Sequence, residues 1–138
     1  MKQLSLFTIL FLGAISMAQN HKDSQRLSAL DYMKLYSNVN CENQSGTMLE
    51  HKICLNKKFQ KVDSVLNRRF VSYLDIIPND SLKSKLKVYQ ENWVSNRRLQ
   101  SELYSMDAQG NSLGILYLTA MIHTTQNRIE ELELLIGR

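Results

Sequence analysis

The chain has 138 residues, of which 43% are hydrophobic and 22% are charged, with 17 Lys and Arg against 13 Asp and Glu. The net charge of +4 is small and spread along the chain, so it does not by itself indicate nucleic-acid binding.

The first residues have the pattern of a secretory signal peptide. Lys2 gives a short basic start, residues 4–15 are mostly apolar, and Ser16 and Ala18 place small residues at the −3 and −1 positions. The apolar run is about a dozen residues long, fewer than the ~20 that a membrane-spanning helix needs. The first cysteine, Cys41, is too distant for a lipoprotein anchor. We therefore expect residues 1–18 to be removed.

Residues 19–138 are then expected to form one exported domain, periplasmic or secreted, without a transmembrane segment. Losing Lys2 leaves sixteen basic against thirteen acidic residues, a net charge of +3. The sequence does not indicate an oligomeric state.

The remaining chain is predicted to be helical, because it contains only one proline, Pro78, and four glycines. A short first helix is expected over residues 24–37, with a loop after it. Thr47 and Glu50 have the spacing of a capping box at the start of a long helix. Its apolar residues recur at steps of three and four and form a stripe of Leu55, Phe59, Val62, Leu66, Phe70 and Tyr73.

Two further long helices are expected. One begins near Asn79 or Asp80, ends near Tyr104, and has a predicted apolar stripe of Leu82, Leu86, Tyr89, Trp93 and Leu103. After a turn-rich loop over 105–112, Ser112 is the expected cap of a last helix with a stripe of Leu118, Ile122, Thr125, Ile129, Leu132 and Ile136. The predicted fold class is all-α, an antiparallel bundle of three long helices plus a shorter N-terminal helix and one disulfide.

Each long helix carries a polar residue at the edge of its predicted core face. Asp63 and Asn67 border the first stripe, Arg97 follows Trp93 by four residues, and Arg128 precedes Leu132 by four. A buried carboxylate is tolerated when guanidinium groups pair with it. We therefore expect Asp63 to pair with Arg97, Arg128 or both, in a structural rather than a catalytic role.

Cys41 and Cys54 are the only cysteines, thirteen residues apart. An exported location favours a disulfide between them, and a loop of this size predicts a stabilisation of roughly 3 kcal/mol. Zinc binding is disfavoured because no histidine stands at ligand spacing, and a redox role because no Cys-x-x-Cys motif occurs.

The same residues, in this order, resemble the family of LprI-type lysozyme inhibitors, which are small exported bacterial domains. The segments that carry the resemblance are "CLNKKFQKVDSVLNRRF", "YQENWVSNRR", "GNS" and "TQNRIEEL". The residues at its motif positions are Cys54, Phe59, Asp63, Leu66, Asn67, Phe70, Gln90, Trp93, Arg97, Ser112, Thr125, Arg128 and Leu132. Two departures stand out. Ser101 and Ala120 occupy the places where members usually carry a second cysteine pair, and the turn reads Gly-Asn-Ser instead of Gly-Gly-Ser.

The resemblance implies a helical exported domain that inhibits lysozyme, not an enzyme. The residues that we expect to form a structural polar core are Asp63, Asn67, Trp93, Arg97, Thr125 and Arg128. The expected partner-binding segment is the 105–114 loop, through Asp107, Gln109, Asn111 and Ser112. No cofactor, metal or nucleic acid is expected. The alternative is an envelope protein that binds anionic surface polymers through a basic helix face of Lys57, Lys61 and Arg68, with Lys58, Arg69, Lys83, Lys85 and Lys87 nearby.

Overall fold

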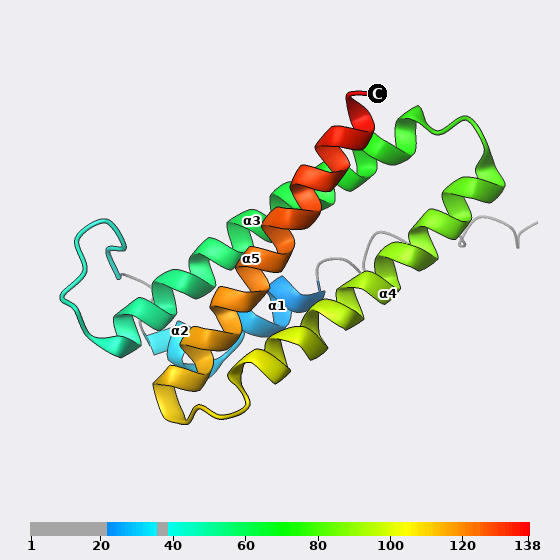
Figure 1. The fold of residues 1–138 in the computed structure, drawn as a ribbon. Helices are drawn as coiled ribbons and strands as arrows, with labels where there is room; N and C mark the ends of the chain where they lie inside the picture. The colour runs from blue at the N-terminus through cyan, green and yellow to red at the C-terminus, as the bar shows by residue number, and fades with distance from the viewer. Residues whose placement is uncertain (1–21, 36–38) are drawn as a thin grey trace, which may run out of the picture.

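The structure, a computed structural model, describes residues 22–35 and 39–138, so the predicted signal peptide lies outside the described residues. Within these ranges the chain forms five helices and no strand (Figure 1). They are α1 (Lys22–Ser28), α2 (Asp31–Leu35), α3 (Met48–Ile76), α4 (Asp80–Ser105) and α5 (Gly110–Ile136). The predicted all-α class and the three long helices are confirmed.

Helix α3 is the central element, and its ends follow from local chemistry. Thr47 is the N-cap, and its Oγ1 accepts from the Glu50 amide at 3.2 Å. The Glu50 carboxylate accepts from the backbone and hydroxyl of Ser45, not from the Thr47 amide, so only half of the predicted capping box forms. The helix ends before Pro78, which cannot donate a backbone hydrogen bond.

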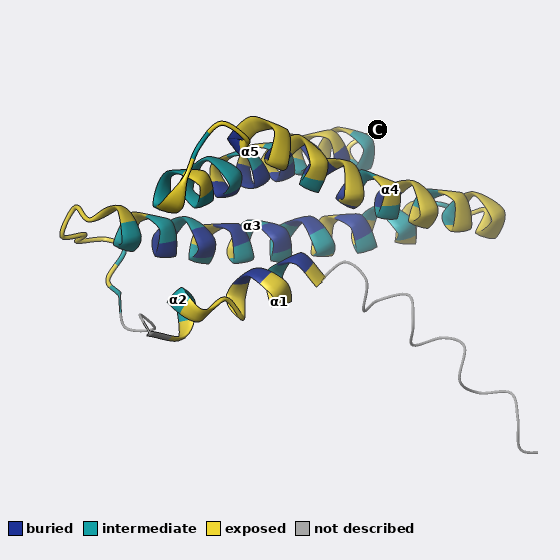
Figure 2. Ribbon diagram, turned by 90° about the horizontal axis from the view of Figure 1, so that it is seen from below, coloured by how far each residue is buried: buried dark blue, intermediate teal, exposed yellow. Residues whose placement is uncertain are grey.

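Helices α5 and α1 pack directly on α3, whereas α4 packs mainly on α5. Helix α5 packs along α3 and also contacts α4, while α1 packs on α3 from the side opposite to α5 (Figure 2). The core consists of two apolar clusters at different heights along α3. The first contains Leu27, Phe59, Leu118, Met121 and Ile122, and the second contains Leu66, Phe70 and Leu132. The predicted stripes of α3 and α5 therefore face the core.

The predicted stripe of α4 is wrong at Leu82, Tyr89 and Leu103, although Trp93 packs against the second apolar cluster as expected. Tyr89 is 52% exposed and Leu103 is 58% exposed. The buried face of α4 instead carries Gln90, Val94, Arg97, Ser101 and Ser105. This face is offset by one residue position, about 100° around the helix. Its small hydroxyl residues are satisfied locally, since the Oγ atoms of Ser101 and Ser105 donate to carbonyls one turn earlier.

The single N-terminal helix expected over 24–37 is also wrong, because α1 and α2 are separate helices. A continuous helix would need the Leu27 carbonyl to accept from the Asp31 amide. That carbonyl accepts instead from the Leu30 amide at 3.5 Å and from Asn56 Nδ2 of α3 at 2.9 Å, and the Asn56 amide nitrogen is also 2.8 Å from Tyr32 Oη. Asn56 is fully buried and so fixes both short helices to α3.

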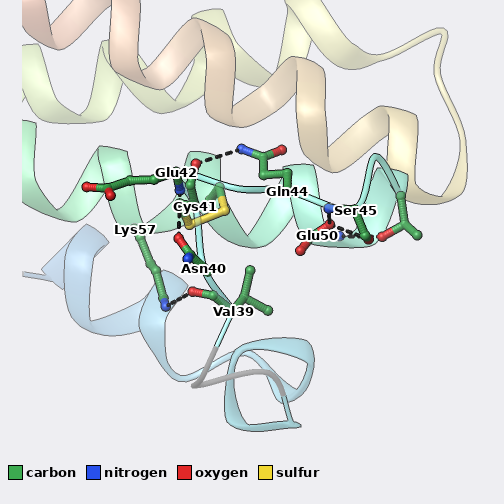
Figure 3. The surroundings of a disulfide bond; sticks show 10 residues. Val39, Asn40, Cys41, Glu42, Gln44, Ser45, Glu50 and Lys57 are labelled. Atoms are coloured by element: carbon green, nitrogen blue, oxygen red, sulfur yellow. Dashed lines mark hydrogen bonds between the residues drawn. A yellow bond between two sulfur atoms is a disulfide. The ribbon is translucent and has the colours of Figure 1, made fainter.

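The predicted disulfide between Cys41 and Cys54 is confirmed (Figure 3). It joins the 39–47 segment to the second turn of α3, with the two Cα atoms 5.4 Å apart. Lys57, one turn further along α3, donates to the Val39 carbonyl at 3.2 Å and holds the same segment (Figure 3). Within the described residues, no helix combines the length and apolarity that a bilayer crossing requires.

Candidate functional site

Arg97 of α4 lies at the centre of a buried polar cluster between the two apolar clusters. Its Nη1 donates to Asp63 Oδ1 of α3 at 2.8 Å and to Thr125 Oγ1 of α5 at 2.9 Å. Its Nη2 donates to Asp23 Oδ2 of α1 at 2.8 Å. One guanidinium therefore connects four helices. Charge-assisted hydrogen bonds of this kind tolerate burial because both charges find partners.

Asp23 is the member of this cluster that the sequence analysis missed. It is fully buried, and its other oxygen accepts from Arg98 Nε at 2.6 Å. Its neighbour Ser24 donates to Asp63 Oδ2 at 2.7 Å. The available signal was the position of Asp23 four residues before the apolar Leu27, which places both side chains on the same face of a helix.

Arg128 does not join Asp63, although the sequence left that pairing open. Its Nε donates to Gln90 Oε1 at 3.1 Å, and its Nη1 pairs with Glu131 at 2.6 Å. Trp93 is half-buried against the second apolar cluster, and its ring lies near both guanidinium groups, 5.1 Å from Arg97 and 5.9 Å from Arg128. Asn67 is half-buried on α3, one turn after Asp63.

The polar cluster is closed to solvent. Asp63, Arg97 and Thr125 are each at most 1% exposed. Asp63 is already bound by Arg97 and Ser24. No member of the cluster lines the surface hollows on α3, beside the disulfide or between α1 and α5. The described residues contain no group of His, Cys, Asp and Glu side chains that is suited to hold a metal ion.

The α4–α5 corner, residues 106–109, is the second candidate. The loop is shorter than expected because α5 begins at Gly110, two residues before the predicted cap Ser112. Gly110 has a positive φ of 57°, which glycine adopts without strain, so the chain turns directly into the helix. Asp107 and Gln109 are exposed in the corner.

The other two predicted contact residues lie in the first turn of α5. Asn111 is half-buried, and its Oδ1 accepts from Lys52 Nζ of α3 at 2.7 Å. Ser112 is half-buried beside it. The four residues therefore lie within one short segment, but Asn111 holds the corner against α3, while Asp107 and Gln109 face solvent.

The fold and these two features define a small all-α domain with one disulfide, an internally paired polar core and an exposed interhelical corner. A comparison with family models matches residues 41–132 to the family described as lysozyme inhibitor LprI. The match covers the disulfide, α3, α4 and most of α5, so the chain belongs to this family. No curated protein and no solved structure matches it. Asp23 lies before the matched segment, although it completes the polar core.

Proposed function

We propose that this protein is an exported inhibitor that protects cell-wall peptidoglycan by binding a lysozyme. The observation that carries the proposal is membership of the LprI family over residues 41–132. The Cys41–Cys54 disulfide agrees with export, since such bonds persist in oxidising compartments outside the cytoplasm. Removal of residues 1–18 by cleavage after Ala18 is part of the same proposal.

The polar core is proposed to be structural, and lysozyme to bind elsewhere. A lysozyme cannot reach Asp63 or Arg97 without unfolding the bundle, because both side chains are buried and paired. The role of Asp63, Asn67, Trp93, Arg97, Thr125 and Arg128 is then to set the relative positions of the long helices.

The α4–α5 corner is proposed as the contact surface. It is a narrow turn between two long helices at one end of the molecule (Figure 1). Two hydrogen bonds restrict the conformation of the corner. Lys52 donates to Asn111, and the Ala108 amide donates to the Ser105 carbonyl at 3.0 Å. A preorganised turn loses little conformational entropy on binding. Asp107 and Gln109 supply polar groups that can bind in the glycan-binding cleft of a lysozyme. Ser112 lies at the edge of this surface.

The charges of this protein and of a cationic lysozyme predict how the rate of association depends on salt. The mature chain has a net charge of +3, so a cationic lysozyme would be repelled at long range. Association should therefore not slow when salt is added. Binding to an anionic polymer would show the opposite response.

The second candidate function is binding of anionic surface polymers, and one feature favours it. Lys57, Lys61 and Arg68 line a surface hollow of about 500 Å³ on α3. Lys57 and Lys61 also line a neighbouring hollow of about 580 Å³ beside the disulfide, together with Lys58 and His51. The predicted basic face of α3 therefore presents several cations together.

The clearing of a bacterial cell-wall suspension by lysozymes of different types, with and without the purified mature protein, tests the proposal. We expect micromolar protein to slow clearing by at least one type, with undiminished potency in added salt. If no type is slowed and the protein is retained on anionic envelope polymers in a salt-sensitive manner, the polymer-binding function replaces the inhibitor function. The Lys61→Gln variant should weaken that retention and leave lysozyme inhibition unchanged.

A further inference from the structure

A groove of about 500 Å³ lies between α1, α2, α3, the end of α4 and the start of α5. Its size falls within the range of small-molecule sites, about 300–1,000 Å³. The lining is mostly apolar and aromatic, and comes from Leu27, Leu30, Tyr32, Met106, Leu113, Tyr117 and Leu118. Its deepest members, Leu27 and Leu118, belong to the first apolar cluster of the core. The groove therefore offers an apolar surface that reaches the core.

Two cations line the same groove, and both are held in place. Lys52 Nζ donates to Asn111 Oδ1 and lies 4.2 Å from the centre of the Tyr32 ring. Arg26 Nη2 donates to Tyr117 Oη at 2.9 Å and pairs with Asp23 Oδ1 at 3.4 Å, a carboxylate that Arg97 and Arg98 also bind. Glu102 is the one carboxylate in the lining, and it is exposed at the rim. The groove therefore carries an excess of positive charge beside its apolar wall.

The position of Lys52 depends on the absence of a side chain at residue 114. A Cβ at Gly114 would lie 2.6 Å from Lys52 Cδ, closer than non-bonded carbon atoms approach. The stem of Lys52 thus passes directly over the α5 backbone, with its ammonium group at the groove. Partial burial there lowers the pKa of Lys52, and an anion bound beside the ammonium group would raise it again.

We propose that this groove binds a free amphipathic anion, with its acid group between Lys52 and Arg26 and its apolar body against Leu27, Tyr117 and Leu118. An amphipathic anion matches both features of the lining, because its apolar body fits the apolar wall and its acid group fits the two cations. The proposal goes beyond lysozyme inhibition and does not rest on it, because Asp107 and Gln109 do not line the groove, although Lys52 and Met106 connect the groove to the corner.

Calorimetric titration of the mature protein with octanoate, octanol and acetate tests the proposal. Octanoate has both an acid group and an apolar chain, octanol lacks the charge, and acetate lacks the chain. We expect saturable one-to-one binding of octanoate, at least about tenfold weaker binding of octanol, and none of acetate. Equal affinity for octanoate and octanol, or no saturation with octanoate, would overturn the proposal.

Variants locate the site. Lys52→Gln should weaken octanoate binding about tenfold or more, because it removes the charge but keeps a side chain of similar length. Gly114→Ala should also weaken it, since the added methyl group displaces Lys52. The matched control is Lys61→Gln, on the same helix but outside this groove, which should bind as the wild type does. Equal loss in Lys52→Gln and Lys61→Gln would contradict the assignment.

Sedimentation with lipid vesicles distinguishes the binding of a free anion from the binding of a lipid head group in a bilayer. We expect the protein to remain in the supernatant when vesicles of phosphatidylglycerol are sedimented, because a ligand must leave the bilayer to enter the groove. Co-sedimentation that Lys52→Gln abolishes would assign the anion to a bilayer lipid and overturn the free-ligand assignment. Amide shifts of Gly110 and Gly114 on octanoate addition give an independent readout on the folded wild type.

Discussion

Arg97 Nη2 and Asp23 Oδ2 lie 2.8 Å apart in the core, although the two residues are 74 positions apart in the chain. Both side chains are fully buried. The ion pair joins α1, which begins shortly after the predicted cleavage site, to α4, the second of the three long helices. It makes the N-terminal helix part of the core and not an appendage.

Asp23→Ala should destabilise the protein by about 3–5 kcal/mol, because it leaves the buried guanidinium of Arg97 with one carboxylate fewer. Urea unfolding followed by circular dichroism measures this change. The matched control is Asp31→Ala, since Asp31 is exposed and its pair with Lys34 is a surface contact at 3.5 Å. Equal stabilities of the two variants would show that α1 does not pack as described.

Asp63→Ala should destabilise by a similar amount, about 3–5 kcal/mol, because Arg97 and Ser24 both lose a partner. Asp63→Asn should cost less, since the amide oxygen still accepts from Arg97 and the amide nitrogen can donate to Ser24 Oγ. The same unfolding assay compares the two substitutions. If Asp63→Ala unfolds at the wild-type denaturant concentration, Asp63 is not a buried ion-pair partner.

Replacing both cysteines by serine should lower the free energy of unfolding by roughly 3 kcal/mol, because the bridge no longer restricts the unfolded chain. Mass spectrometry of unreduced peptides from exported protein should first find Cys41 and Cys54 in one linked pair. Two free thiols in that sample would contradict the disulfide. The three long helices should persist in the variant, since their core contacts lie along α3 and not in the 39–47 segment.

Trp93→Ala should destabilise by about 3 kcal/mol, because the half-buried ring contacts the second apolar cluster and lies over Arg97. Trp93→Phe should cost about 1 kcal/mol, since much of the ring contact remains. Tyr104→Ala, at an exposed aromatic on the same helix, is the control and should change stability by less than about 0.5 kcal/mol. Native Trp93 fluorescence as red-shifted as that of the unfolded chain would contradict the placement.

The long helices α3 and α5 were predictable because regular apolar spacing determines which face is buried. Phe59, Leu66 and Phe70 follow that spacing and are buried. The buried face of α4 was not predictable in the same way, since all of its buried residues except Val94 are polar. Polar residues enter a core only when partners on other helices satisfy them, and those partners are not visible in local spacing.

The residues of the candidate site were likewise predictable only in part. The pairing of Asp63 with an arginine followed from the cost of burying a lone charge. Asp23 was missed because the first helix was predicted to begin at residue 24, whereas α1 begins at Lys22 and includes Asp23 on its buried face. The separation of α1 from α2 depends on Asn56, a residue 29 positions away from Leu27, and therefore on tertiary structure.

Lysozyme inhibition by a corner variant is the most direct test of the account. The variant carries Asp107→Ala and Gln109→Ala. The control carries Asp75→Ala and Gln126→Ala, which change the same residue types at exposed positions outside the corner. Inhibition constants from cell-wall clearing, with stability checked by thermal unfolding, should rise about 30-fold or more for the corner variant and stay unchanged for the control. Full inhibition by a folded corner variant, or an equal loss in the control, would contradict the claim that lysozyme binds at the α4–α5 corner.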